Sequence, residues 1–491
     1  MNLTIKKSLY IFVAALSVTL FGCKRELDIN KDPNKPDVSQ GSPKLIFPTA
    51  VMSTAGRVGG ELNIIGGIWS QFFTQSWSSS QYRTIDAYNL QNSDYTGSYT
   101  ELFSGALVNY QYVIDTAKSR ADWNFYLMGT VMKAYTVEVL ADLYDKIPYS
   151  QSLQGTANLN PAFDDGYSIY TDLLSKIDDA LSKDFTAATN TQAGASDLVF
   201  KGKIDMWIKF ANTLKLKMYL RMVNAKPAEA QAGIQKLYSS GAKFLDADAA
   251  VAGFTETPDK QNPFYAYNIQ RLNTTTNLRA SKTFVSWLEA NQDTLRLQYY
   301  YGVDSPVVIN QGDYLGTDPT YGGATVLNQS PTDPVEFISL PESYFLQAEA
   351  RLRYYSGDQT QALYEKGVLA AFAEIGGDGS DYIAPGGAYA FPVAGSNEAK
   401  LEAIIVQKWA ALAYGCHSLE AFFEQNRTGY PKTSAVYSNV PGYIPGQFVY
   451  SPNGVTGGAF PKRLVYPNVE RNRNKSTPAE VPITTPVWWA K

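Results

Sequence analysis

The feature that most constrains the fold is a series of helix-length apolar stripes that occur in pairs. In residues 124–144, Ala134, Val137, Ala141 and Tyr144 recur at helical spacing and form one face, with small residues that let a neighbouring helix approach. Short turns between such segments favour antiparallel neighbours, so we expect an all-α stack of helical hairpins without a strict repeat. The predicted pairs are 99–120 with 124–144, 167–181 with 203–224, and 341–356 with 358–373, followed by helices 397–414 and 418–426.

Residues 44–74 are also mostly helical in pattern, but glycine pairs interrupt them. Ile64, Ile68 and Phe72 are spaced as one side of a helix, whereas Gly59-Gly60 and Gly66-Gly67 predict breaks. In residues 203–224 the large apolar side chains follow a helical stripe and are expected to be core; they include Trp207 and Met218.

The N-terminus carries an export signal. Lys6 and Lys7 precede an apolar run that ends at Phe21, which is the order of a secretory signal peptide, and the run is too short to span a bilayer. Leu20-Phe21-Gly22-Cys23 resembles a bacterial lipobox, so we expect a signal peptide at 1–22, lipidation of Cys23 and anchoring to a membrane, with an ordinary cleaved signal as the alternative. Residues 23–43 are polar and contain Pro33 and Pro36, which predicts an extended tether.

Composition excludes several classes of function. The chain of 491 residues has a net charge of −4 and a single histidine, His417. We therefore expect no nucleic-acid partner, no zinc site with several imidazoles and no serine or cysteine triad. With two cysteines, and Cys23 assigned to lipid, Cys416 has no disulfide partner; it continues an apolar stripe and is expected to be inert core. We assign no catalytic residue, no metal and no cofactor.

Two irregular stretches carry the candidate binding residues. Residues 75–98 are rich in Ser, Gln, Asn and Tyr and read as a long loop, and 246–335 lose helical periodicity while Gly and Pro multiply. Exposed rings in such loops offer flat apolar faces to sugars, while amides and guanidinium groups bond to hydroxyls. The alternatives are that the rings seal the domain and that Arg271 is a structural ion-pair partner. The candidates are Trp77, Tyr82, Tyr265, Tyr267, Asn268, Arg271 and Tyr314.

Two acidic motifs could suggest a catalytic pair or a calcium site, but we interpret both as structural. Glu342 and Glu349 share a predicted helix that Pro341 opens, and we interpret them as structural carboxylates rather than an acid/base pair. Residues 376–381 lack the ligand spacing of a calcium loop.

Five ordered motifs resemble those of SusD/RagB-type proteins, the outer-membrane nutrient-binding lipoproteins of Bacteroidota. They span nearly the whole mature chain. The matching segments are Leu27-Asp28-Ile29-Asn30 with Asp32-Pro33-Asn34, Leu140 to Ser150, Pro341 to Ala350, Ala421 to Pro431 and Phe460 to Asn472.

The resemblance implies a tetratricopeptide-like stack of helical hairpins that supports an irregular, loop-rich part with the ligand site. The SusD-like domain would be 44–491, with scaffold at about 44–245 and 336–430 and the loop-rich part at about 75–98 and 246–335. It also implies a non-catalytic, surface-exposed lipoprotein of the cell outer membrane that binds oligosaccharide and delivers it, as a lid, to a SusC-like TonB-dependent transporter.

Three alternatives remain open at this point. A peptide-binding lid of the RagB kind would use the same aromatic loops. A surface glycosidase would need two carboxylates about 5 to 9.5 Å apart across a cleft, and no motif indicates such a pair. A purely structural lipoprotein would have the same scaffold without a ligand.

Overall fold

The computed structural model describes residues 41–490, and from Pro43 onward they form one compact unit. The predicted signal peptide, Cys23 and most of the predicted tether lie outside the described residues. Among the helices of the described part, none is both long enough and apolar enough to cross a bilayer.

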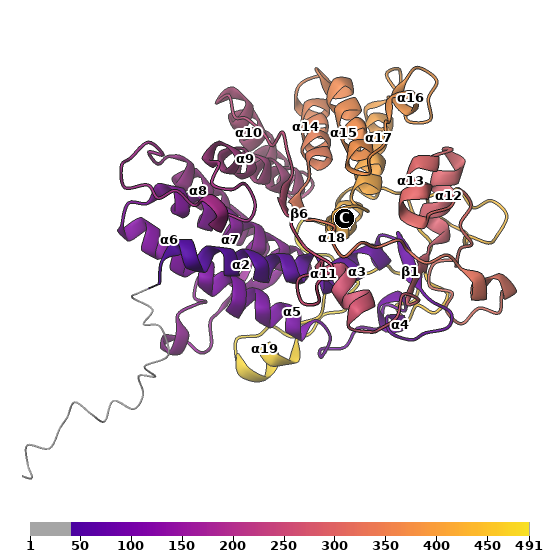
Figure 1. Cartoon of the computed structure of the whole chain (residues 1–491), viewed down its shortest axis with the longest axis horizontal. Coiled ribbons are helices and arrows are strands. Elements are labelled where there is room, and N and C mark those ends of the chain that lie inside the picture. The colour runs from indigo at the N-terminus through magenta and orange to yellow at the C-terminus, as the bar shows by residue number, and fades with distance from the viewer. Residues whose placement is uncertain (1–40, 491) are drawn as a thin grey trace, which may run out of the picture. The chain divides into compact units, whose positions relative to one another are not determined.

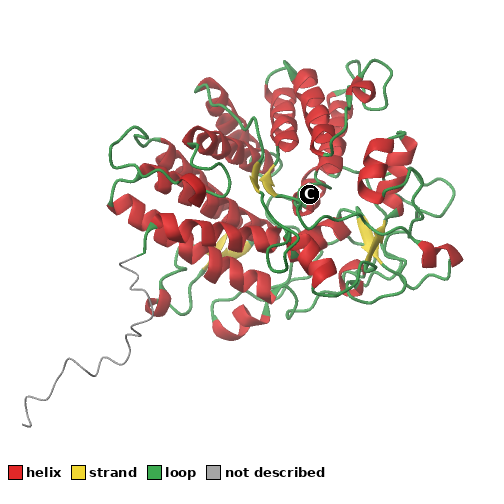
Figure 2. Cartoon of the chain, in the orientation of Figure 1, coloured by secondary structure: helices red, strands yellow, loops and turns green. Residues whose placement is uncertain are grey.

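Helices dominate the unit, and strands are few and short (Figures 1 and 2). The expected all-α class is therefore confirmed. The α-helices are α2 (Pro43–Val58), α3 (Glu61–Trp69), α4 (Arg83–Asp86), α5 (Thr96–Glu101), α6 (Val108–Ser119), α7 (Trp123–Tyr144), α8 (Gly166–Leu181), α9 (Ile204–Arg221), α10 (Pro227–Ser239), α11 (Pro263–Tyr265), α12 (Lys282–Ala290), α13 (Thr294–Tyr301), α14 (Leu340–Tyr354), α15 (Thr360–Glu374), α16 (Ser380–Ile383), α17 (Asn397–Ala411), α18 (Ser418–Thr428) and α19 (Asn468–Arg473).

The scaffold consists of helical hairpins whose members pack on each other: α6 on α7, α8 on α9, and α14 on α15. Figure 1 shows α14, α15 and α17 side by side in its upper part. The pairs start where the sequence supplies caps. The Asp165 carboxylate accepts from the Ser168 N–H at the start of α8, and the Ser339 hydroxyl accepts from the Glu342 N–H at the start of α14.

Most predicted helix bounds agree with the structure to within a few residues, but the predicted helix 99–120 is divided into α5, the π-helical turn η3 (Leu102–Leu107) and α6. Gly59-Gly60 separate α2 from α3 as expected, but Gly66 and Gly67 lie inside α3 and break nothing. A Cβ on Gly66 would overlap the backbone of Leu419, so Gly66 allows α18 to approach α3 closely, while a Cβ on Gly67 would overlap the ring of Phe73. Helices α10 and α13 were not predicted.

Three antiparallel two-stranded ribbons connect segments that are distant in sequence. The pairs are β1 (Phe73–Gln75) with β5 (Leu278–Ala280), β2 (Lys146–Pro148) with β3 (Phe163–Asp165), and β4 (Ala249–Val251) with β6 (Val335–Ile338). The β4–β6 ribbon joins the two ends of the loop-rich stretch 246–335, and the β1–β5 ribbon ties the start of the stretch 75–98 to it.

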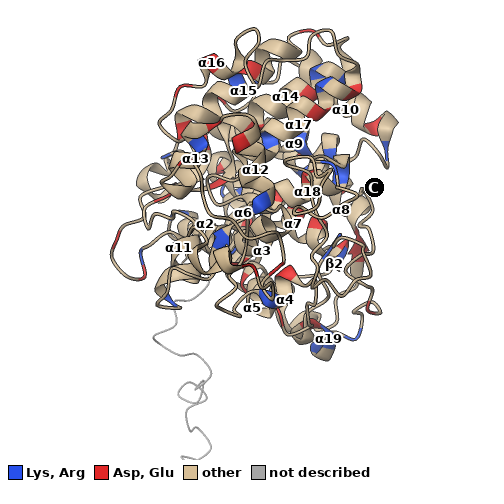
Figure 3. Ribbon diagram, turned by 90° about the vertical axis from the view of Figure 1, so that its right-hand side faces the viewer, with Lys and Arg blue, Asp and Glu red and all other residues tan. Residues whose placement is uncertain are grey.

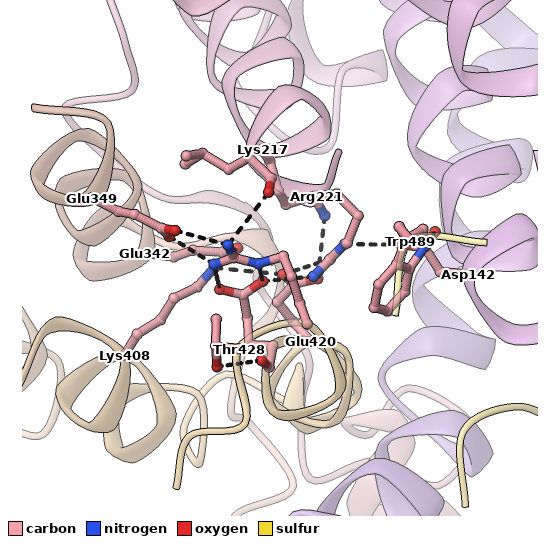
Figure 4. A network of polar contacts seen from close by, with 12 residues as sticks. Asp142, Lys217, Arg221, Glu342, Glu349, Lys408, Glu420, Thr428 and Trp489 are labelled. Carbon is pink, nitrogen blue, oxygen red and sulfur yellow. Dashed lines mark hydrogen bonds and ion pairs between the residues drawn. The ribbon is translucent and has the colours of Figure 1, made fainter. Parts of the chain in front are cut away.

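A network of buried ion pairs lies where α7, α9, α14, α17 and α18 meet (Figure 4). Arg427 binds both carboxylate oxygens of Glu349, at 2.7 and 2.8 Å, and Lys408 lies 3.3 Å from Glu342. All four side chains are almost completely buried. The interpretation of Glu342 and Glu349 as structural carboxylates is therefore confirmed.

The expected core residues are buried as well. Trp207 and Met218 have no exposed surface, and Cys416 is buried, which raises the pKa of its thiol to about 12. On the ribbon of Figure 3, the positions of acidic and basic residues are interspersed over many elements rather than gathered by sign.

Candidate functional site

A groove of about 750 Å³ lies between the outward face of α2 and the first part of the segment from β4 onward. We call it the α2–η6 groove, because its other wall is the π-helical turn η6 (Ala266–Gln270). Its volume is in the range of small-molecule sites. The side chains that give it its chemistry are Met52, Ser53, Arg57, Glu101, Asp259, Lys260, Tyr267 and Arg271.

Tyr267 is the central aromatic side chain of this groove. Its hydroxyl accepts a hydrogen bond from Nη1 of Arg57 at 2.5 Å, and the guanidinium of Arg271 lies over the ring at 4.1 Å from its centroid. Arg271 itself is exposed. The ring is thus fixed by one arginine and covered by another that can move or offer its own outer plane to a ligand.

The local sequence explains why Tyr267 is held there. Asn262 caps the preceding turn, since its side chain accepts from the Tyr265 N–H at 3.1 Å, and Pro263 occupies the first turn. The chain then continues into the π-helical turn, a geometry that is frequent at functional sites. Tyr265, another predicted candidate, is half-buried on the same turn.

The α2 wall supplies polar groups and one apolar side chain. Ser53 donates to Glu101 at 2.8 Å, and Met52 is largely exposed. We did not predict the contribution of α2 to the site. The signal was present, because Thr49, Met52, Ser53, Gly56 and Arg57 recur at helical spacing on the face opposite the buried residues of that helix.

Tyr82 and Asn268 lie together behind the groove, in the interior. The Tyr82 hydroxyl donates to Oδ1 of Asn268 at 3.2 Å, and the two side chains are 7% and 2% exposed. The expectation that rings in 75–98 would be exposed is therefore wrong for Tyr82, and Tyr88 and Tyr95 are buried too. The alternative that such rings seal the domain holds for these three.

Trp77 is the exposed ring of this stretch, with 46% of its surface accessible. It follows β1, where the Ser76 N–H donates to the Asn277 carbonyl at 2.7 Å and extends the β1–β5 ribbon. Trp77 does not line the α2–η6 groove.

Tyr314 is buried, with the guanidinium of Arg83 5.3 Å from its ring centroid. Burial raises the pKa of its hydroxyl. Of the seven candidates, the structure brings Tyr267 and Arg271 together in the groove and pairs Tyr82 with Asn268 behind it.

The buried side chain of Asp86 binds several residues around the polar stretch 75–98. This completely buried carboxylate accepts from the Thr74 hydroxyl at 2.6 Å, the Gln75 N–H at 2.8 Å and the Gln311 amide at 2.8 Å. Burial raises its pKa to about 6, and these hydrogen bonds oppose the rise. The residues after β1 are therefore ordered by an internal acceptor rather than by regular secondary structure.

A second cavity, of about 360 Å³, lies among α12, α15 and α17. Trp287, Tyr389 and Lys432 line it, and it contains none of the predicted candidates. The α2–η6 groove is larger and contains two of them, so it is the better candidate site.

Comparison with known families decides the relationship of this chain. A family model described as "Starch-binding associating with outer membrane" matches residues 44–452. The chain belongs to the SusD-like family. The resemblance seen in the five sequence motifs is thus confirmed.

Solved SusD-like structures share the fold at low sequence identity. A chitin-binding SusD homolog from Flavobacterium johnsoniae superimposes with a TM-score of 0.74 at 22% identity, covering 91% of this chain and 98% of the homolog. A SusD homolog from Bacteroides uniformis gives 0.73 at 22% identity, covering 91% and 99%, and a SusD-like protein from Bacteroidetes gives 0.72 at 18%, covering 92% and 100%. These matches confirm the tetratricopeptide-like helical fold. No curated protein matches the chain.

Proposed function

We propose that this protein is a non-catalytic outer-membrane lipoprotein that binds an oligosaccharide in the α2–η6 groove. As a lid, it would deliver that oligosaccharide to a SusC-like TonB-dependent transporter. The observation that carries the proposal is the meeting of Tyr267 and Arg271 in a wide, partly polar groove. The family description, with its starch binding and outer-membrane association, supports the ligand class and the location.

The chemistry of the groove suits a neutral, hydroxyl-rich ligand. Arg57, Arg271 and Lys260 supply donors, Glu101 and Asp259 supply acceptors, and Tyr267 and Met52 supply apolar surface. Sugars present alternating hydroxyl edges and C–H faces, which such a mixture can bind by hydrogen bonds and ring contact together. Because both charge signs are present, the groove has no strong preference for an anionic or a cationic ligand.

The other five candidates are proposed in different roles. Trp77 is proposed as a further contact for a long chain, because its ring is exposed. Tyr82, Asn268 and Tyr314 are proposed to support the site from behind, since they are buried, and Tyr265 to line its edge.

A binding panel tests the ligand class. Calorimetric titration of the purified protein with starch- and chitin-derived oligosaccharides should give saturable heats, while product analysis after overnight incubation should show no new reducing ends. Binding of peptides alone would favour the peptide-binding lid. Steady release of shorter sugars would contradict the non-catalytic assignment.

A pull-down tests the partner. The tagged protein is purified by affinity from its native membrane without a crosslinker. It should recover an outer-membrane β-barrel transporter in a molar amount nearly equal to its own. Recovery without any barrel partner would contradict the lid role and leave the binding panel unaffected.

A further inference from the structure

Three carboxylates from distant parts of the chain converge away from the α2–η6 groove. Asp248 directly precedes β4, Glu336 lies in β6, and Glu374 is the last residue of α15. One oxygen of each lies within 4.8 Å of the other two. Like charges this close repel strongly in a low-dielectric interior, so their convergence needs a compensating positive charge or proton.

Among the described residues, no lysine or arginine forms an ion pair with any of the three. Oε2 of Glu336 and both carboxylate oxygens of Glu374 are buried and have no hydrogen-bond partner. Elsewhere in this protein, a buried glutamate such as Glu349 is matched by a bidentate arginine. An unpaired buried carboxylate is costly, and that cost makes this cluster exceptional within the fold.

A fourth, independent group faces the cluster. His417 is 5% exposed, neither ring nitrogen has a hydrogen-bond partner, and its Nε2 lies 3.7 Å from Oε2 of Glu336. The distance is too long for a hydrogen bond and short enough to become one if the carboxylate turns toward a ligand. Carboxylates that bind metal ions are themselves usually held by hydrogen bonds from neighbouring groups, and His417 is placed to supply one.

The carboxylate of Glu336 occupies the space that a side chain at Gly415 would need. Gly415 has a φ of 67°, and a Cβ at that position would overlap Oε2 of Glu336. The Gly415 carbonyl also accepts from the Glu336 N–H at 2.8 Å. A glycine is therefore required here both for its left-handed conformation and for the space that the carboxylate occupies.

The chemistry of the ligand atoms, all of them carboxylate oxygens, indicates a hard divalent cation. Calcium accepts six to eight oxygen ligands in a flexible arrangement, whereas magnesium requires a nearly ideal octahedron and retains several of its waters, so three carboxylates from unrelated elements suit calcium better. We propose that Asp248, Glu336 and Glu374 bind one calcium ion, with His417 behind Glu336 as a hydrogen-bond donor that orients it. Water molecules complete the coordination, as is usual for calcium.

The position of the ion gives it a structural consequence. Asp248 and Glu336 stand at the two ends of the irregular stretch 246–335, and the β4–β6 ribbon joins them. Glu374 adds the C-terminus of α15, where a cation is favoured by the helix dipole. Calcium would therefore fasten the base of the loop-rich part to the helical scaffold.

Calcium binding can be measured directly. After treatment with EDTA and dialysis, the purified protein is titrated calorimetrically with calcium chloride and, separately, with magnesium chloride. We expect one calcium per chain, a rise in melting temperature with calcium, and at least tenfold weaker binding of magnesium. Absence of both heat and a calcium-dependent melting shift would overturn the proposal, as would tighter binding of magnesium.

Variants assign the site. Glu374→Gln should weaken calcium binding at least tenfold and remove the melting shift, whereas Glu365→Gln, on the same helix and outside the cluster, should bind as the wild type does. Asp248→Asn provides a second removal should Glu374→Gln fail to fold. Unchanged calcium affinity in Asp248→Asn or Glu374→Gln would overturn the assignment. A further outcome is that Glu374→Gln is more stable than the wild type without calcium, while the wild type does not respond to calcium. That result would show that the three carboxylates share a proton rather than a calcium ion, and it would also overturn the assignment.

Discussion

At the scale of residues, the loop-rich part is ordered by individual buried polar groups. Asp86 accepts three hydrogen bonds from the residues of β1 and from Gln311, and Tyr82 donates to Asn268 across 186 residues of sequence. Each bond replaces contacts with water, so its net contribution is modest, but leaving such a group unpaired is costly. The polar sequence of this stretch therefore encodes internal partners rather than an exposed loop.

The raised pKa of Asp86 predicts a dependence of stability on pH. In the folded protein the carboxyl has a pKa of about 6, against 3.8 as a model value, so the folded state binds this proton more tightly. The contribution of Asp86 to the free energy of unfolding is therefore greatest below pH 3.8 and declines as pH rises to 6.

Urea unfolding of wild type and Asp86→Asn across this range measures the effect. Relative to the variant, the wild type should lose about 3 kcal/mol of unfolding free energy between the two pKa values. A constant difference between the two proteins at all pH values would show that Asp86 has an ordinary pKa.

The buried ion pairs predict that single substitutions in the network strongly lower the free energy of unfolding. Arg427 is fully buried between Glu349 and Glu424, so Arg427→Ala would remove the bidentate partner of Glu349 and leave the buried network with an excess of negative charge, which should lower the free energy of unfolding by about 3–5 kcal/mol. Lys432 pairs with Glu402 at the surface, and Lys432→Ala should cost about 1 kcal/mol or less. Similar losses for the two variants, in the same denaturant titration, would contradict a structural role for the network.

At the scale of elements, glycine placement separates close packing from helix breaking. The predicted break at Gly66-Gly67 is wrong, because Gly66 accommodates α18 against α3 and Gly67 accommodates the ring of Phe73. A sequence shows the low helix propensity of glycine but not the neighbour that requires it.

Alanine substitutions test this distinction. Gly66→Ala should destabilise the protein, since its Cβ would overlap the backbone of Leu419, although alanine is the better helix former. Gly56→Ala, inside α2 with open space around the new Cβ, should stabilise by about 0.5–1 kcal/mol. Equal shifts in melting temperature for both variants would show that α3 and α18 have room to separate.

The sequence predicted long helices well and the site only in part. Stripes such as that of α7 identify core faces because they repeat over many turns. Whether a tyrosine in a polar stretch is exposed depends on distant partners such as Asn268 for Tyr82, which no local pattern shows. Trp77 and Arg271 are exposed as expected, whereas Tyr82 and Tyr314 are not.

At the scale of the whole molecule, the proposed lipoprotein has a predicted lipid site at Cys23 and a helical body that contains the α2–η6 groove. The predicted tether of polar residues between Cys23 and α2 would let that body move over a membrane partner. Fold similarity alone does not establish what is bound, because one fold serves many ligands.

Removal of the predicted lipid site tests the anchor. Cys23→Ala should move the protein from the outer-membrane fraction to a soluble fraction, because acyl chains supply the membrane affinity. Western blotting of separated fractions measures the shift, and metabolic labelling with a fatty-acid analogue should mark the wild type alone. Membrane retention of the variant without label would indicate another means of attachment.

The most direct test of the central claim is calorimetric titration of wild type, Tyr267→Ala and Tyr344→Ala with the best oligosaccharide from the binding panel. Both tyrosines are half-buried and lie near a cationic side chain, but Tyr344 is on α14, away from the groove. We expect at least tenfold weaker binding for Tyr267→Ala and wild-type affinity for Tyr344→Ala, with both variants folded. Wild-type affinity of Tyr267→Ala would contradict binding in the groove.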